Sequence, residues 1–220
     1  MNALREERFV DMSSAVASGD HSGHGAEMSA EEVSFNERKV RFGMLLYVLA
    51  DVLFVIFMLV TYPWLRAYNT DNGWFPFKGM QLPDQGTSLA LVILMVVSAV
   101  FFFLGYLGIR SGNQVVLRVS MLLSWLIMLA ALIGQIKFMG AQQFAAADGT
   151  FADTWLLFSG YHIYHLLWAV FLGLGITNRS LHGKYTKEHH VGVVTIGYFW
   201  YWAALTPVLF YILMALLPPK

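Results

Sequence analysis

Two histidines, His162 and His165, lie three positions apart in the apolar stretch SGYHIYHLLWAVFLG, which spans residues 159–173. Residues three apart share one face of a helix, so the two imidazoles are expected to face the same neighbours. Imidazole binds metal ions, carries protons near neutral pH and forms hydrogen bonds across helix interfaces. This pair is therefore the first candidate for chemistry.

Asp51 and Gln135 are two further polar side chains in apolar surroundings. At about 1.5 Å per residue, Asp51 lies roughly 14 Å in from Phe42, while His162 and His165 lie roughly 12 and 16 Å in from the opposite face. All three titratable groups are thus expected near the membrane midplane. An ionised carboxylate at that depth costs about 2.5–3.5 kcal/mol, so Asp51 should face protein or water, or be neutral by protonation.

Three interpretations of these residues are open: hydrogen bonding between helices, proton handling, and ligation of a metal or haem. Catalytic zinc sites rich in histidine use three protein ligands, and only Asp51 lies at a depth comparable to the histidines. The chain has no cysteine, which excludes thiolate sites, iron–sulfur clusters and covalently attached c-type haem. The sequence favours a polar cluster of Asp51, His162 and His165, structural or proton-related, and predicts no catalytic, cofactor or metal site.

The composition indicates a membrane protein. Of the 220 residues, 57% are hydrophobic and 13% are charged, which leaves too little polar surface for an ordinary soluble domain. The formal net charge is zero, so no basic excess suggests nucleic acid as a partner. The aromatic run YFWYW, residues 198–202, is interpreted as packing and interface surface.

Five apolar runs are each long enough to span a bilayer, for which about 20 helical residues are needed. Because a segment in lipid must satisfy its own backbone hydrogen bonds, and these runs are about twice the length of barrel strands, all five are predicted to be helices. The fold class is therefore an all-α integral membrane protein, a bundle of five transmembrane helices at about 42–62, 88–109, 117–136, 154–176 and 191–216.

The chain is predicted to divide into a polar arm, residues 1–37, disordered or docked on a partner, and a transmembrane domain, residues 38–220. The distribution of Lys and Arg between the two sides places the N-terminus in the cytoplasm and the C-terminus outside. On the cytoplasmic side, a basic loop is expected to form an interface with anionic headgroups, with Arg179, His189 and His190 as its candidate residues.

Three stretches resemble one known family. SGYHIYHLLWAVFLG, followed by a basic loop and HHVGVVTIGYFWYW, is similar to the last two helices of subunit III of the haem–copper oxidases. Those helices carry Gly–aromatic–His–x–x–His and then His–His–x–Gly before an aromatic cluster. RFGMLLYVLADVLFVIFMLVTY, residues 41–62, resembles the helix of the same family that holds a buried carboxylate.

The chain departs from the family pattern at several positions. Asp51 stands where the family usually has Glu, and the last helix has Val194, Tyr201 and Ala204 where Glu, His and Asp are common. The usual family form has seven helices, whereas this chain resembles a five-helix bacterial-type form that lacks the first two. In some relatives an equivalent pair of helices is appended to subunit I.

The resemblance implies a non-catalytic subunit of a cytochrome c oxidase-type terminal oxidase in a bacterial plasma membrane. Its partners would be the catalytic subunit I and the other oxidase subunits, and it would also bind phospholipid. Haem and copper would lie in the partner subunits. The chain would stabilise subunit I and support proton uptake. Two alternatives stay open: a subunit III-like component of a quinol oxidase or nitric oxide reductase, and an independent proton-coupled transporter.

Overall fold

The computed structural model describes residues 30–69, 74 and 80–218, and over these residues every regular element is a helix. The long helices are α2 (Ala30–Ala67), α3 (Gln85–Arg110), α4 (Gln114–Gly140), α5 (Thr150–Leu181) and α6 (Val191–Leu216), and a short 3-10 helix, η1 (Ala146–Asp148), precedes α5. All five long helices are long and apolar enough to cross a membrane. The prediction of an all-α membrane protein with five spanning helices is confirmed.

The chain divides into two units, residues 1–36 and residues 37–220. The predicted arm, residues 1–37, lies mostly outside the described residues, and its described part belongs to the first turns of α2. There the Ser34 hydroxyl donates a hydrogen bond to the Glu31 carbonyl at 2.9 Å. The second unit contains all the features discussed below.

Side-chain caps define where α3 and α4 begin. Asp84 precedes α3 and accepts hydrogen bonds from the Thr87 amide at 2.7 Å and the Thr87 hydroxyl at 2.6 Å. Asn113 precedes α4 and accepts from the amides of Val115 and Val116, both at 3.1 Å. These caps satisfy amides at the helix start that have no partner within the helix.

A tight turn joins α3 to α4. Gly112 has a φ of 77°, a left-handed conformation that glycine adopts without the steric cost of a Cβ atom. Just before the turn the two helices approach closely, because a Cβ atom on Gly108 would lie 2.8 Å from Val116 Cγ1. Small residues permit such an approach in lipid, where close packing replaces the hydrophobic effect as the force between helices.

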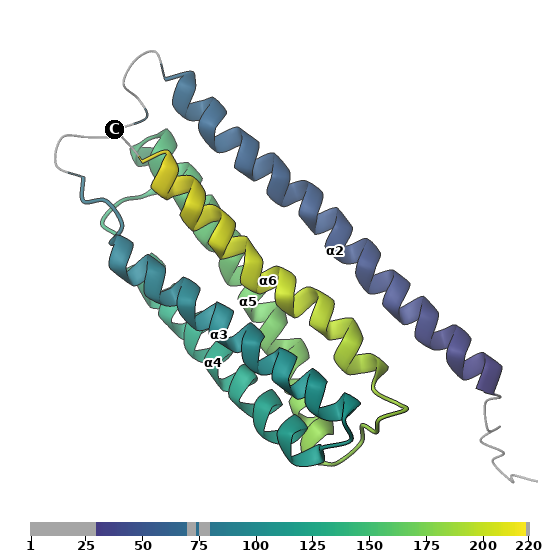
Figure 1. Ribbon diagram of the computed structural model, residues 1–220. Helices are drawn as coiled ribbons and strands as arrows, with labels where there is room; N and C mark the ends of the chain where they lie inside the picture. The colour runs from purple at the N-terminus through teal and green to yellow at the C-terminus, as the bar shows by residue number, and fades with distance from the viewer. Residues whose placement is uncertain (1–29, 70–73, 75–79, 219–220) are drawn as a thin grey trace, which may run out of the picture. The chain divides into compact units, whose positions relative to one another are not determined.

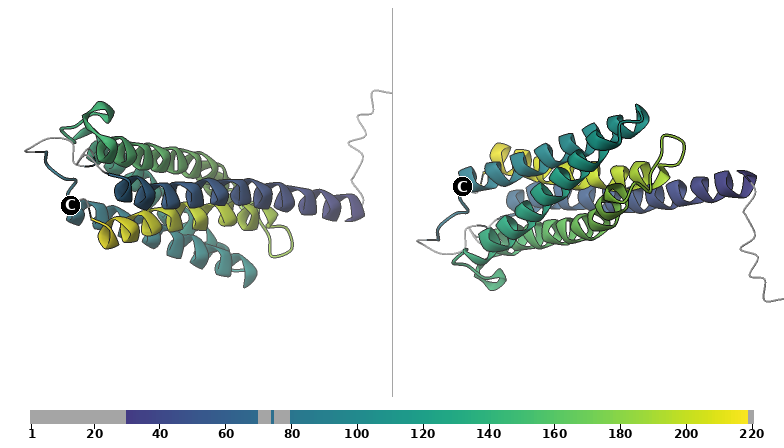
Figure 2. Two further views of the ribbon diagram at one scale, coloured as in Figure 1. Left: turned by 90° about the horizontal axis from the view of Figure 1, so that it is seen from above. Right: turned by 90° about the horizontal axis from the view of Figure 1, so that it is seen from below.

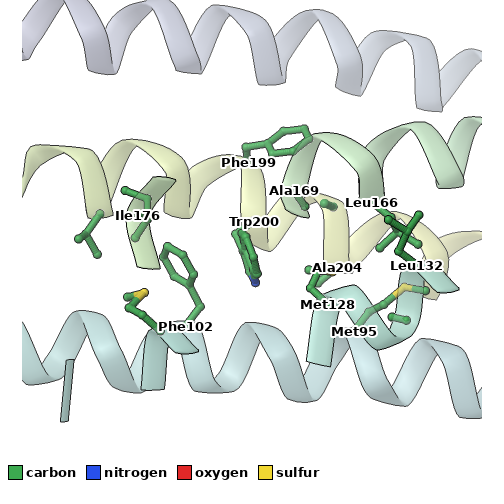
Figure 3. Packing of buried hydrophobic residues seen from close by; sticks show 14 of the residues in the cluster. Met95, Phe102, Met128, Leu132, Leu166, Ala169, Ile176, Phe199, Trp200 and Ala204 are labelled. Atoms are coloured by element: carbon green, nitrogen blue, oxygen red, sulfur yellow. The ribbon is translucent and has the colours of Figure 1, made fainter. Parts of the chain in front are cut away.

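Helices α3, α4, α5 and α6 form a closed ring in which α3 and α5 each lie beside both α4 and α6 (Figure 1). The views in Figure 2 also show α3 and α4 side by side. Apolar side chains from all four helices fill the ring, and Figure 3 shows Trp200 of α6 inside this core near Phe102 of α3. Their two rings stack with centroids 5.1 Å apart.

A small hydrogen-bonded group links three helices of the ring. Ser98 of α3 and Ser124 of α4 each donate through their hydroxyl to the other's backbone carbonyl at 2.8 Å. The Trp200 indole N–H of α6 donates to the Ser98 hydroxyl at 3.1 Å. Trp200 is therefore held both by ring stacking and by a directional bond, which fixes its position in the core.

The Asp84 cap is expected to protect the start of α3 in a pH-dependent way. The hydrogen bonds from Thr87 lower the pKa of the Asp84 carboxyl below its ordinary value. A carboxyl with a lowered pKa stabilises the folded helix end above its ordinary pKa, about 3.9, and this contribution is lost as the pH falls through the folded-state pKa. In Asp84→Ala, the amides of residues 86–88 should exchange with deuterium faster than in the wild type at neutral pH.

The difference between Asp84→Ala and the wild type should shrink as the pH is lowered below about 4, once rates are corrected for intrinsic exchange. Asp84→Asn is the matched control, because asparagine caps helices about as well as aspartate without titrating. If the wild-type amides of residues 86–88 kept the same protection from deuterium exchange at pH values well below about 4, the role assigned to the Asp84 charge would be contradicted.

Candidate functional site

The Asp51 carboxylate of α2 is the point at which polar side chains of three helices meet. Its Oδ1 accepts a hydrogen bond from the Tyr161 hydroxyl of α5 at 2.5 Å. Its Oδ2 accepts from the His165 ring Nε2 of α5 at 2.7 Å and from the Trp202 indole N–H of α6 at 2.5 Å. We call Asp51, Tyr161, His165 and Trp202 the Asp51 cluster.

The helical spacing on α5 explains why two donors reach the same carboxylate. Tyr161 and His165 are four residues apart and therefore lie on one face. Their rings meet edge to face with centroids 4.3 Å apart, and the other His165 nitrogen, Nδ1, lies 3.2 Å from the Tyr161 carbonyl. Phe199 of α6 stacks on the His165 ring with centroids 5.9 Å apart, so the imidazole is held from two sides.

The Asp51 cluster is shielded from solvent. The His165 side chain is 0% exposed and the Asp51 side chain is 11% exposed. The contact between them is an ion pair when the imidazole is protonated and a hydrogen bond to a neutral ring otherwise. In either state the carboxylate accepts while the hydroxyl and the indole donate, so Asp51, Tyr161 and Trp202 each have a partner. Both ring nitrogens of His165 donate only when the imidazole is protonated.

The second histidine of the pair faces a different helix. His162 is 4% exposed, its Nε2 lies 2.9 Å from the Met95 sulfur of α3, and its Nδ1 has no hydrogen-bond partner among the described residues. Residues three apart on an α-helix differ by about 60° around its axis, which is enough to reach different neighbours. The structure thus brings together Asp51 and His165 and leaves His162 outside the Asp51 cluster.

Tyr161 and Trp202 complete the Asp51 cluster, and the sequence reasoning did not single them out. Trp202 belongs to the aromatic run that was interpreted as packing surface. The available signal was the N–H or O–H group on each ring, because a buried tyrosine or tryptophan usually finds a hydrogen-bond partner. A buried carboxylate on another helix is such a partner.

A second contact holds the other end of α2. The Tyr62 hydroxyl donates to the Leu217 carbonyl at 2.9 Å, and the Arg66 guanidinium Nε donates to the Pro218 carbonyl at 3.1 Å. Between these contacts α2 exposes mostly apolar side chains, among them Leu53 and Phe57 at 62% and 64%. The helix is therefore attached at two levels and presents a wide apolar face outward.

The predicted interface residues lie at the end of the ring where α5 ends and α6 begins. The Arg179 guanidinium lies 5.5 Å from the centre of the Tyr185 ring, and burial raises the pKa of the Tyr185 hydroxyl while Arg179 opposes that shift. The His189 amide donates to the Thr186 hydroxyl at 3.0 Å, and the His190 ring lies 6.3 Å from Tyr106.

Metal ligation was one interpretation of the polar residues. Within the part of the chain that the structure describes, no group of three or more His, Cys, Asp or Glu side chains is placed to hold a metal ion. The contacts of the Asp51 cluster permit hydrogen bonding and proton sharing between an imidazole and a carboxylate.

The fold and this site define a class: multi-pass helical membrane proteins in which a buried carboxylate ties one long helix to a helical ring. Comparison with known proteins names the family. The family model described as "Cytochrome c oxidase subunit III" matches residues 19–217. The chain belongs to this family, whose members are subunits of a multi-subunit terminal oxidase, and the resemblance seen in the sequence is confirmed.

Curated relatives agree with this assignment at low identity. Cytochrome c oxidase subunit 3 of Loxodonta africana is 22% identical over 184 residues, which cover 80% of this chain and 69% of that protein. The subunit 3 of Mammuthus primigenius is 23% identical over 79% of this chain and 67% of that protein. That of Prototheca wickerhamii is 24% identical over 74% of this chain and 63% of that protein.

Proposed function

We propose that this chain is a structural subunit, without a redox centre of its own, of a haem–copper terminal oxidase in a bacterial plasma membrane. Haem and copper lie in the partner subunits, and subunit I is the direct partner. The Asp51 cluster is the observation that carries the proposal. In this cluster the buried carboxylate of α2 forms hydrogen bonds to side chains of α5 and α6 and so joins the three helices.

The outward apolar face of α2 supports a role in assembly. In the apolar 18-residue segment of α2, only 11% of the residues are buried within the chain. The corresponding share is 28–39% for the other four spans. An apolar helix face needs lipid or another protein as its environment. The catalytic subunit I and bound phospholipid are the occupants that membership of an oxidase complex favours.

Support of proton uptake is the second element of the proposal. An imidazole and a carboxylate 2.7 Å apart are able to share and release a proton, and both lie near mid-membrane. Orientation follows the charge distribution, with the N-terminus and the loop of Arg179, His189 and His190 in the cytoplasm and the C-terminus outside. That loop meets anionic headgroups at the membrane surface.

Purification of the oxidase with and without this chain tests the proposal. Without it, the haem and copper content per subunit I should stay the same, because no centre is assigned to the chain. Activity should decay faster during turnover, and proton uptake measured by time-resolved absorption should slow. Return of the wild-type chain should reverse both effects, whereas loss of a haem or copper together with the chain would refute the structural role.

The electron donor separates the remaining family alternatives. Oxidation of reduced cytochrome c by the purified complex favours the cytochrome c oxidase type, whereas oxidation of a soluble quinol favours the quinol oxidase. Reduction of nitric oxide in place of oxygen indicates the nitric oxide reductase alternative. Proton transport by the chain reconstituted alone in vesicles would instead support the independent transporter.

A further inference from the structure

A cavity of about 90 Å³ lies among α3, α4, α5 and α6, and none of the four residues of the Asp51 cluster lines it. Its lining extends from the exposed residues Leu82, just before α3, and Gln85, the first residue of α3, to the buried residues Met95 and His162. At about 1.5 Å per residue, Gln85 to Met95 covers about 15 Å, half of a hydrocarbon core of about 30 Å. The cavity thus runs from one end of the ring to mid-membrane.

Besides His162, three of the buried side chains that line the cavity carry polar groups. Gln135, Ser159 and Trp155 are 8%, 6% and 4% exposed, and none of them makes a side-chain hydrogen bond to a residue within the described ranges. The amide and the hydroxyl each donate and accept, and the indole donates. Buried polar groups are normally satisfied by protein or by ordered water, so these three groups favour an occupant that forms hydrogen bonds.

The size and charge of the cavity restrict that occupant. No Asp, Glu, Lys or Arg is among the lining residues, so an ion would lose its hydration without a counter-charge. A water molecule needs at least about 10–15 Å³ of such space, so the cavity has room for several waters. A phospholipid fits poorly, because its headgroup stays at the surface whereas the unpartnered polar groups lie inside the ring.

The geometry points to a hydrated pocket: a cluster of ordered waters fills this cavity, bonds to Gln135, Ser159 and Trp155, and brings water against the ring of His162. This gives His162 contact with the aqueous phase at one membrane surface. His165, on the same helix but outside the cavity, has no such contact. The proposal of a hydrated pocket does not depend on the function proposed for the Asp51 cluster, and the two are tested by different experiments.

Hydroxyl-radical footprinting of the intact oxidase tests the pocket directly. A brief X-ray pulse in ¹⁸O-labelled water oxidises methionine to its sulfoxide where water lies next to the sulfur. Met95 and Met128 are 1% and 0% exposed and belong to the same core (Figure 3). Of these two, only Met95 lines the cavity. We expect Met95 to be oxidised several-fold faster than Met128, with ¹⁸O incorporated. Equal rates would overturn the pocket.

A pair of matched variants locates the water. Gln135→Leu removes the amide from the cavity and should slow the oxidation of Met95 several-fold. Gln143→Leu makes the same change eight residues after Gln135, beyond the end of α4, at an exposed residue that does not line the cavity, and should leave Met95 unaffected. Protection of Met95 in the wild type, together with a stoichiometric lipid or detergent in the purified complex, would assign the cavity to an amphiphile and refute the hydrated pocket.

Deuterium exchange at the imidazole carbon between the two ring nitrogens gives a second measurement that needs no substitution. This carbon exchanges over days at a rate set by the pKa of the ring and by the access of water to it, so each rate is compared with the rate expected from the pKa that the pH profile of the same exchange gives. His162 should exchange faster than His165 in the same complex, since only His162 lines the cavity. Equally slow exchange at the two histidines would count against the pocket.

Discussion

Replacement of Asp51 by leucine is expected to loosen the attachment of α2 to α5 and α6 more than any other single change in the membrane-spanning region. The carboxylate accepts three hydrogen bonds, and leucine accepts none. Hydrogen bonds between helices in membranes contribute roughly 0.6–1.7 kcal/mol each, so three of them amount to about 2–5 kcal/mol. Asp51→Asn keeps a carbonyl acceptor and should fall between leucine and the wild type.

Spin labels offer a direct measurement of this effect, because the chain has no cysteine of its own. Phe57 of α2 and Ile212 of α6 are exposed at 64% and 48% and suit labelling after substitution by cysteine. In the purified oxidase, the distance distribution between the two labels should be narrow in the wild type and broad in Asp51→Leu. A narrow distribution in Asp51→Leu would show that α2 is held by other contacts.

A methyl group on Gly173 is expected to destabilise the helical ring. A Cβ atom there would lie 2.5 Å from Trp200 Cζ3 and 3.0 Å from Trp125 Cδ1. Neither ring is free to move, because Trp200 donates to Ser98 and the Trp125 indole donates to the Val170 carbonyl at 2.9 Å. Overpacking of this kind costs about 1–3 kcal/mol, so Gly173→Ala should lower the thermal midpoint at which this chain is lost from the oxidase.

Gly175→Ala is the matched control for Gly173→Ala. It lies two residues further along α5, and a Cβ atom at Gly175 meets nothing within 4 Å. Alanine is more favourable than glycine in a helix by about 1 kcal/mol, so this variant should be neutral or slightly more stable than the wild type. If both variants lowered the midpoint equally, the cause would be the loss of glycine flexibility in α5. Close packing of Gly173 against the tryptophans would then be excluded as the cause.

The number and type of the helices were predictable because each span is a long apolar run, and a run in lipid can satisfy its backbone only as a helix. The ends of the helices were less predictable. α5 extends from Thr150 to Leu181, beyond the apolar run at both sides, because polar residues at the membrane surface continue the same hydrogen-bond ladder. Hydropathy shows where contact with lipid ends, but the hydrogen bonds of the helix backbone can continue beyond that point.

The partners of Asp51 were only partly predictable. Depth along the helices placed Asp51 and His165 at the same level, and they do meet. Depth carries no information about rotation around the helix axis, which decides that His162 faces Met95 of α3 while Tyr161 and His165 face α2. The rotation is set by packing in the ring, including the approach of Gly173 to Trp200, and such contacts between distant segments leave no local pattern in a single sequence.

The separation of Asp51 from its partners along the chain has a consequence for biogenesis. Tyr161, His165 and Trp202 are made 110, 114 and 151 residues after Asp51. At a synthesis rate of about 5–20 residues per second, the ribosome needs roughly 5–30 s to supply them. During that interval α5 and α6 do not yet satisfy the acidic residue of α2, so Asp51 must meet water or a temporary polar neighbour, or stay protonated, until α6 arrives.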